Sequence, residues 1–220
     1  MKISEALSHK PIVIDHRGNL GNLQKKRTVE NTTHSLWNTY ADAIELNVCL
    51  TQNTINLEDL LPIPKDKKLF IEIKLPKSSS PDKNYINKVT RKLVDFIRDN
   101  KLAEKVIVIC SSGEVLDRIK TLNPNIKTAL NVFCGEGKSP KKISSLRRDF
   151  GFDSLLLPFS QVKKYAIDSC HIEGIDVYPW VYRENPLAEI RKATRLIEMG
   201  VDGIITNQVE ILRRIIDEST

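Results

Sequence analysis

The sequence predicts an α/β protein in which eight parallel strands close into a (β/α)8 TIM barrel. Short β-branched runs alternate with longer runs of helical period to the end of the chain. Eight such pairs fit a closed barrel better than an open doubly wound sheet, which usually has about five or six strands. No linker or low-complexity segment divides the chain, so we expect residues 1–220 to form a single domain.

The expected elements follow one another in regular order. The strands are 11–17, 43–49, 68–75, 105–111, 127–133, 153–159, 176–182 and 202–206, and the helical patterns are 31–41, 57–62, 84–100, 113–122, 140–149, 161–172, 186–199 and 208–218. Ser80-Pro81-Asp82 and Asn185-Pro186 are good helix starts, because proline suits the first helical turn. Gly174 and Gly200 are expected helix ends.

Composition and charge exclude several classes of protein. The chain has no run of eighteen apolar residues, and its first ten residues contain no apolar segment of signal-peptide length, so we expect a cytoplasmic protein without a membrane anchor. The net charge of +6 suits an anionic partner. Aromatic residues make up only 6% and none is interleaved with the basic clusters, so nucleic acid is not an expected partner.

The four cysteines are Cys49, Cys110, Cys134 and Cys170, and no two form a CxxC pair. Three of them follow apolar runs, where cysteine behaves as a small hydrophobe. We therefore expect reduced core thiols rather than disulfides or a zinc site. No feature of the sequence predicts an oligomeric state.

Polar side chains gather where the first three strands end. The first strand ends in Asp15, His16 and Arg17, the second carries Glu45 and Asn47, and the third carries Glu72 and Lys74. Residues two apart in a strand project from one face, and the carboxyl ends of barrel strands carry the chemistry of such folds. These pairs are therefore expected in the barrel mouth, while apolar neighbours such as Ile44 and Ile71 fill the other face.

Two carboxylates and an amide on adjacent strands are suitable oxygen ligands for Mg²⁺ or Ca²⁺. A cation beside His16, Arg17 and Lys74 would bind a phosphate, so the mouth indicates phosphate-ester chemistry. The alternative is that Glu45 and Glu72 form stabilising salt bridges with Lys74 and Arg17. Buried ion pairs seldom repay their desolvation, which favours the site.

Six short motifs are similar to those of one family. They are "HRG" at 16–18, "ENT" at 30–32, "IELNVCLTQN" at 44–53, "FIEIKLP" at 70–76, "VYPWVY" at 177–182 and "GVDGIITNQ" at 200–208. In this order the chain resembles the glycerophosphodiester phosphodiesterases over nearly its whole length. The resemblance implies a barrel of the phospholipase C-like phosphodiesterase type. Such a barrel uses a divalent cation to hydrolyse small glycerophosphodiesters to an alcohol and glycerol 3-phosphate.

The resemblance also implies roles for individual residues. His16 would be an acid/base histidine, Arg17 would hold the phosphate, and Lys74 would stabilise charge on the phosphoryl oxygens. Glu45 and Glu72 would be metal ligands. The remaining site residues are Asn47 in the third ligand position, Glu30 as a polar member, Trp180 as a pocket wall and Arg183 as an added positive charge near the mouth.

The chain departs from the family pattern at several positions. The "HD" stretch with the family's second histidine, and the small subdomain after it, are absent between the second and third strands. Asn47 stands where the family usually has aspartate, which removes a negative charge, and Arg183 replaces a small polar residue. Asp15 stands where a small residue is usual, and strand alternation aims it away from His16.

The three other histidines, His9, His34 and His171, are expected to lie outside the site. Two functional hypotheses therefore remain. The first is a trimmed metal-dependent phosphodiesterase, favoured by the set of polar residues at the strand ends. The second is a catalytically degenerate barrel that binds a phosphate ligand or acts as a regulatory module, favoured by the missing histidine.

Overall fold

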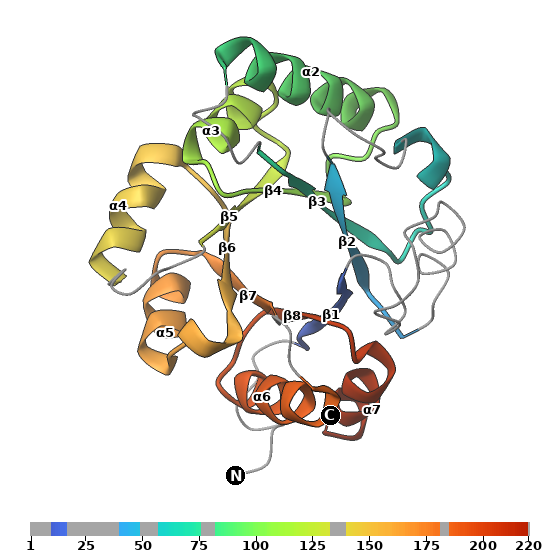
Figure 1. The fold of residues 1–220 in the computed structure, drawn as a ribbon, viewed down its shortest axis with the longest axis vertical. Helices are drawn as coiled ribbons and strands as arrows, with labels where there is room; N and C mark the ends of the chain where they lie inside the picture. Colours follow the sequence, from blue (N-terminus) through green and yellow to red (C-terminus); the bar gives the residue numbers. More distant parts are fainter. Residues whose placement is uncertain are drawn as a thin grey trace.

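The computed structural model describes residues 10–16, 40–48, 57–75, 82–132, 140–180 and 185–219, without the side chains of 48, 59, 60, 140–144 and 219. Eight parallel strands form a closed barrel in chain order, with β8 paired to β1 (Figure 1). The strands are β1 (Ile12–Asp15), β2 (Ala43–Val48), β3 (Lys68–Ile73), β4 (Val106–Cys110), β5 (Lys127–Asn131), β6 (Ser154–Pro158), β7 (Asp176–Trp180) and β8 (Gly203–Thr206). The predicted barrel is confirmed, although β3, β4, β5 and β6 end one or two residues earlier than expected.

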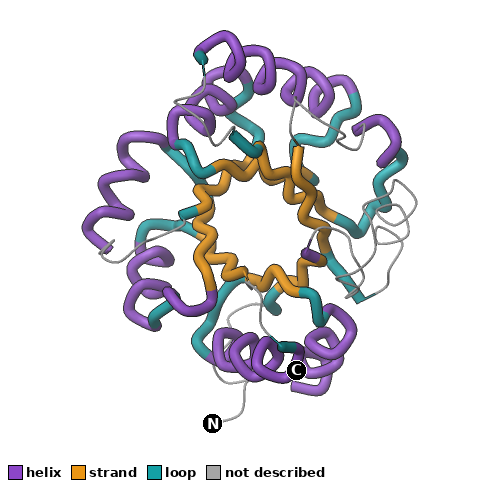
Figure 2. Tube along the Cα trace, in the orientation of Figure 1, coloured by secondary structure: helices purple, strands orange, loops and turns teal. Residues whose placement is uncertain are grey.

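Helices surround the barrel and cover the outer faces of the strands (Figure 2). They are η3 (Leu57–Leu60), α2 (Lys83–Asp99), α3 (Gly113–Leu122), α4 (Pro140–Phe150), η4 (Phe159–Gln161), α5 (Lys164–Ile172), α6 (Pro186–Glu198) and α7 (Val209–Ser219). Helices begin at both predicted starts, where Asp82 and Asn185 are the N-caps and each side chain accepts a backbone N–H of the first turn. Gly174 and Gly200, with φ of 66° and 85°, follow the ends of α5 and α6.

Two helix predictions were wrong in detail. The pattern at 57–62 forms only a single 3-10 turn. The pattern at 161–172 is interrupted because Val162 and Lys163 are extended, with ψ of 128° and 146°, so that α5 begins at Lys164. The pattern at 31–41 lies outside the described residues except for Tyr40 and Ala41, which are not helical.

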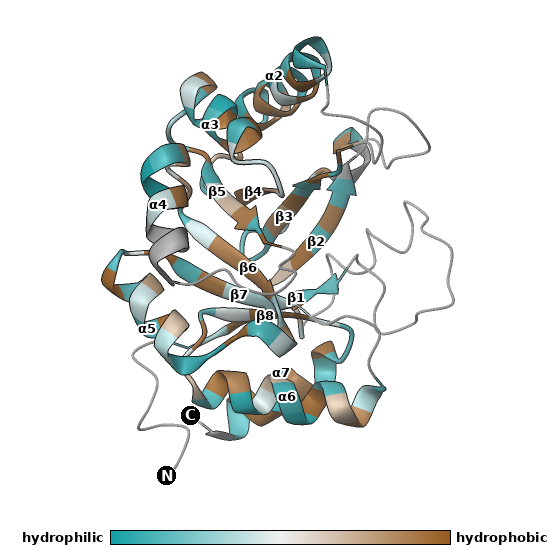
Figure 3. Ribbon diagram, turned by 60° about the vertical axis from the view of Figure 1, so that its left-hand side comes forward, coloured by the Kyte–Doolittle hydropathy of each residue, from teal (hydrophilic) through white to brown (hydrophobic). Residues whose placement is uncertain are grey.

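Strand alternation separates two apolar clusters, one inside the barrel and one between the barrel and the helices. The inner cluster contains Ile14, Ala43, Phe70, Ile107, Ile109, Ala129, Leu156, Tyr178 and Ile205. The outer cluster joins the alternate residues, such as Val13 and Ile44, to the helices. The helices show both hydrophobic and hydrophilic faces, as expected of a layer between core and solvent (Figure 3). Polar residues on the inner face of a strand therefore need a reason other than packing.

Three aspartates fix the amino-terminal end of the barrel, opposite the mouth. Each directly precedes an even-numbered strand and accepts the backbone N–H of a residue in the preceding strand. The bonds are Val13 N to Asp42 Oδ2 at 2.7 Å, Thr128 N to Asp153 Oδ2 at 2.8 Å, and Val177 N to Asp202 Oδ2 at 2.6 Å. Polar residues at this end of a barrel contribute to stability, which leaves the carboxyl end for chemistry.

Candidate active site

The predicted carboxylates lie at the carboxyl end of the barrel interior. Glu45 follows Ala43 by two residues in β2, and Glu72 follows Phe70 by two in β3, so both project from the inner face. They are 4% and 6% exposed. Asn47 is in register with Glu72 on the neighbouring strand, which brings the third predicted ligand to the same level. Two carboxylates this buried require cationic or hydrogen-bonding partners.

His16 follows β1 and lies beside the end of β8. Asp15 is in register with Thr206, so the next residues of the two strands, His16 and Asn207, are neighbours. Their side chains meet with His16 Nδ1 and Asn207 Oδ1 3.0 Å apart. Because the amide oxygen only accepts, Nδ1 carries the proton and donates it. His16 Nε2 is then directed toward Glu45, 4.0 Å from Oε2.

Glu72 is held from two sides. Asn131, the last residue of β5, donates from Nδ2 to Glu72 Oε1 at 3.0 Å. Lys74 Nζ lies 2.5 Å from Glu72 Oε2, and the Lys74 side chain is about half exposed. The ammonium therefore partly neutralises the carboxylate while remaining accessible from the mouth. The alternative to a functional site, in which the carboxylates form stabilising salt bridges, also predicts this contact between Glu72 and Lys74.

Asn131 leaves one polar atom without a hydrogen-bond partner among the described residues. Its Oδ1 is buried although its amide group bonds Glu72. A buried amide oxygen without a donor is costly in a dry interior, and a cation or a substrate hydroxyl would satisfy it. This oxygen and those of Glu45, Asn47 and Glu72 are of the chemical types that Mg²⁺ or Ca²⁺ prefers.

The donor set fits a hard cation in chemistry but carries little charge. Two carboxylates contribute, and the amides of Asn47 and Asn131 are neutral. No group of three His, Cys, Asp or Glu side chains with metal-binding geometry occurs in the part of the chain that the structure describes. A cation at this site would be bound by a few protein oxygens and completed by water, as is usual for Mg²⁺.

Trp180 ends β7 and packs on the inner cluster of the barrel. It is half-buried, with Pro158 and Ile205 as its strand neighbours in register. This position suits the pocket wall that the resemblance implies. Arg17, Glu30 and Arg183 lie outside the described residues, so their roles remain predictions.

Two side chains of the mouth were missed in the sequence, Asn131 and Asn207. Both stand at strand ends, in β5 and directly after β8, and Asn207 belongs to one of the motifs that resemble the family. A search for polar residues at the ends of all eight strands, rather than of the first three, would have found them. His171 was correctly placed outside, since its Nε2 lies 2.9 Å from Asp202 Oδ2 at the opposite end of the barrel.

The cysteines that the structure describes are core thiols. Cys110 and Cys170 are buried and free. Burial raises the pKa of each to about 11, and nearby carboxylates, Glu72 for Cys110 and Asp202 for Cys170, act in the same direction. Neither is therefore a nucleophile at neutral pH. Cys49 and Cys134 lie outside the described residues.

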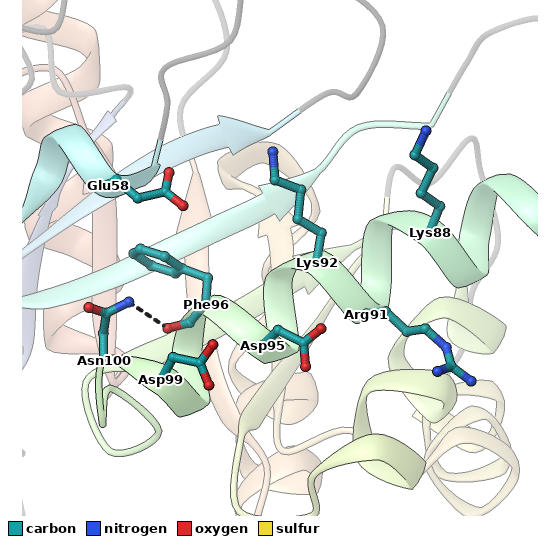
Figure 4. A pocket seen from close by; sticks show the side chains of 8 residues that line it. All are labelled: Glu58, Lys88, Arg91, Lys92, Asp95, Phe96, Asp99 and Asn100. Carbon is teal, nitrogen blue, oxygen red and sulfur yellow. Dashed lines mark hydrogen bonds between the residues drawn. The ribbon is translucent and has the colours of Figure 1, made fainter.

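A separate surface hollow lies along α2, away from the mouth (Figure 4). Lys88, Arg91 and Lys92 line one half of it. Glu58, Asp95, Phe96, Asp99 and Asn100 line the other half. Mixed charges on an open helix face are typical of a solvated surface and indicate no ligand.

The described helices include none that is long and apolar enough to cross a membrane.

Proteins with this architecture, a closed parallel barrel with ionisable groups at its carboxyl mouth, form the class of TIM-barrel enzymes. Comparison with known families narrows the class. A model of the glycerophosphoryl diester phosphodiesterase family matches residues 51–211, and the chain belongs to this family. The matched span includes Glu72, Lys74 and Trp180 and begins after His16 and Glu45.

Individual relatives agree with this assignment. The glycerophosphodiester phosphodiesterase of Caldanaerobacter subterraneus subsp. tengcongensis is 26% identical over 125 residues, which cover 56% of this chain and 47% of that protein. The match thus spans about half the length of this curated relative.

Solved structures show the same fold. A glycerophosphodiester phosphodiesterase from Parabacteroides distasonis superimposes with a TM-score of 0.71 at 17% identity, covering 95% of this chain and 98% of that one. An Oleispira antarctica phosphodiesterase in complex with the product sn-glycerol-3-phosphate gives a TM-score of 0.70 at 14% identity, covering 94% and 97%.

Proposed function

We propose that this protein hydrolyses glycerophosphodiesters to an alcohol and glycerol 3-phosphate. The observation that carries the proposal is the convergence of His16, Glu45, Glu72 and Lys74 at the mouth of a barrel of this family. The Oleispira relative bound to sn-glycerol-3-phosphate supports a small-molecule substrate of the same chemistry.

The reaction requires that water add to phosphorus while the bond from phosphorus to the leaving alcohol oxygen breaks. The proton that water loses must be accepted, and the leaving oxygen must receive one. We assign this proton transfer to His16 Nε2, because Nδ1 is occupied by Asn207. The cationic Lys74 stabilises negative charge on the phosphoryl oxygens in the transition state.

Glu45, Asn47 and Glu72 would hold a divalent cation, Mg²⁺ or Ca²⁺, with Asn131 Oδ1 as a further oxygen beside them. When bound, the cation would supply Lewis-acid stabilisation of the phosphate charge. Without it, Lys74 partly neutralises the charge of Glu72, and Asn131 donates a hydrogen bond to the same carboxylate. Arg17 is proposed to bind the phosphate, and Glu30, Trp180 and Arg183 to shape the substrate pocket.

Hydrolysis assays test this proposal. Purified protein is incubated with glycerophosphocholine or bis(p-nitrophenyl) phosphate in EDTA, Mg²⁺, Ca²⁺ or Mn²⁺. We expect metal-dependent turnover that falls about 10²- to 10⁴-fold in His16→Ala, the usual contribution of an acid/base group. His171→Ala is the matched control and should retain activity, because His171 lies at the opposite end of the barrel.

The binding-module hypothesis predicts a different result. The observation that favours it is the absence of the family's second histidine from the sequence. A folded protein that binds glycerol 3-phosphate in calorimetry but hydrolyses neither substrate with any of the metals would establish this alternative and reject the enzyme.

A further inference from the structure

A carboxylate is buried beneath the site without belonging to it. Glu189, in the first turn of α6, is only 1% exposed. Its Oε1 accepts the hydroxyl of Thr206 at 2.6 Å and the backbone N–H of Asn207 at 2.7 Å. Burying a carboxylate is expensive, and such short hydrogen bonds to it offset part of the cost.

These bonds fix the turn that leaves β8. Besides donating to Glu189, the Thr206 hydroxyl accepts the backbone N–H of Gln208 at 2.9 Å. Three consecutive residues are therefore tied, directly or through Thr206, to one carboxylate. Thr206 faces outward toward α6, so the next residue, Asn207, faces the barrel interior and reaches His16.

Packing alone does not account for a charge at this position. The remaining buried residues of α6 are apolar and attach the helix to the barrel by packing alone. They are Ala193, Leu196 and Ile197. Of the buried residues of α6, Glu189 lies nearest the start of the helix and thus nearest the mouth. It is also the one whose contacts lead, through a single residue, to the predicted acid/base histidine.

We propose that Glu189 is a positioning residue for His16. By holding the backbone of Asn207, it places the Asn207 amide oxygen to accept the Nδ1 proton of His16. The neutral imidazole is thereby kept in the tautomer that carries hydrogen on Nδ1, with the lone pair of Nε2 turned toward the mouth. The effect on catalysis rests on the proposed function, whereas the tautomer is a property of the folded chain.

The tautomer can be measured without any substrate. The ¹⁵N chemical shifts of His16 are recorded on uniformly labelled full-length protein, at a pH where the ring is neutral, and assigned with His16→Gln. We expect the Nδ1–H form to predominate. Glu189→Met, which removes both acceptors at similar volume, should shift the ring toward a mixture of tautomers. Glu189→Gln, whose amide oxygen can accept both bonds, should restore the wild-type pattern.

Asp202→Asn is the matched control. Asp202 also accepts a backbone N–H of a neighbouring strand, but at the opposite end of the barrel. It should destabilise the fold without changing the His16 spectrum. Equal shifts in Asp202→Asn and Glu189→Met would overturn the proposal, as would a wild-type ring that carries its hydrogen on Nε2.

Two further readouts complete the test. Amide hydrogen exchange at Asn207 in the wild-type protein should be slow, and fast exchange would overturn the proposal even if Glu189→Met fails to fold. If the protein is active, Glu189→Met should lower kcat about tenfold with little change in KM, as for other residues that orient a site from behind. An inactive protein with the expected tautomers would reject the proposed function while leaving the role of Glu189 intact.

Discussion

Asn47 and Asn131 set the charge of the barrel mouth. Both stand at strand ends beside Glu72, Asn47 in register with it and Asn131 hydrogen-bonded to it. An aspartate at either position would add a negative charge near Glu45 and Glu72, the second of which pairs with Lys74. The neutral amides therefore make the mouth less negative, which weakens its attraction for a divalent cation.

Asn47→Asp should consequently tighten binding of a divalent cation. A unit charge about 4 Å from a divalent ion contributes at least about 2 kcal/mol even in water, so we expect Kd to fall by about tenfold or more. Isothermal titration calorimetry with Mn²⁺ or Ca²⁺ measures this change.

Asn125→Asp is the control for the added charge. Asn125 is exposed in the turn before β5, at the amino-terminal end of the barrel. The same substitution there should leave Kd nearly unchanged. If both variants bind alike, Asn47 does not contribute to a cation site.

Cys110 provides a prediction about pH. Burial raises the pKa of its thiol from about 9 in the unfolded chain to about 11. The proton is bound in both states below pH 9, so this stabilising contribution is complete there. Between about 9 and 11 the unfolded chain loses the proton first, and folding stability falls as pH rises. Measured against Cys110→Ala in urea, the wild-type free energy of unfolding should decline more steeply across this window.

The rate at which Cys110 is alkylated tests its burial and its raised pKa by a second method. At neutral pH, iodoacetamide should label Cys110 far more slowly in folded than in urea-unfolded protein, as followed by peptide mass spectrometry. Rapid labelling of the folded protein would contradict the burial of this thiol.

At the scale of elements, α7 is attached to the barrel through Arg213. The residue is 9% exposed, and its side chain donates to Asp42, directly before β2, and to the carbonyl oxygen of Tyr40 at 3.3 Å. Asp42 in turn accepts the N–H of Val13 in β1. One arginine therefore joins the last helix to the first two strands.

Arg213→Ala should lower the free energy of unfolding by about 2 kcal/mol, because it leaves the Asp42 carboxylate with fewer partners. The adjacent Arg214 is the natural control. It is exposed and pairs with Glu210 one turn away, so Arg214→Ala should cost about 0.5 kcal/mol or less. Chemical denaturation of both variants gives the comparison, and equal losses would argue against the role of Arg213.

The elements show how far local sequence predicts structure. The pattern at 113–122 coincides with α3, because its apolar residues recur at helical spacing and Ser112-Gly113 breaks the preceding strand. The helix predicted at 161–172 agrees less well, because α5 begins only at Lys164. Its first residues have helical spacing, yet Val162 is buried in the outer cluster in extended conformation. Tertiary packing prevailed there over local periodicity.

At the scale of the whole molecule, the sequence predicted the barrel and the half of the site contributed by β1 to β3. Glu45 and Glu72 lie on the adjacent strands β2 and β3, His16 directly follows β1, and each residue belongs to a recognisable sequence motif. Asn131, Asn207 and Glu189 come from β5, the end of β8 and α6, and only closure of the barrel brings them beneath the same mouth. Their roles depend on neighbours distant in sequence. That residues 1–220 form a single domain stays a prediction.

Closure of the barrel also depends on close packing at Gly203. This residue of β8 is in register with Ile12 of β1. A Cβ at position 203 would lie 2.7 Å from the carbonyl oxygen of Ile12 and 3.1 Å from the Tyr178 ring of β7. The backbone oxygen cannot rotate away as a side chain can. A methyl group would therefore push β8 away from both of its neighbours.

Gly203→Ala should accordingly destabilise the protein by about 1 to 3 kcal/mol, the usual cost of overpacking. Gly174→Ala, which meets no atom within 4 Å but has φ of 66°, should cost about 1 kcal/mol through backbone strain alone. Urea unfolding followed by both far-UV circular dichroism and tryptophan fluorescence measures the loss. If the chain is one cooperative unit, the two signals of each variant coincide and move together, because the contact at Gly203 joins the first strand to the last. Separate transitions would show that the first and last strands do not share one folding unit.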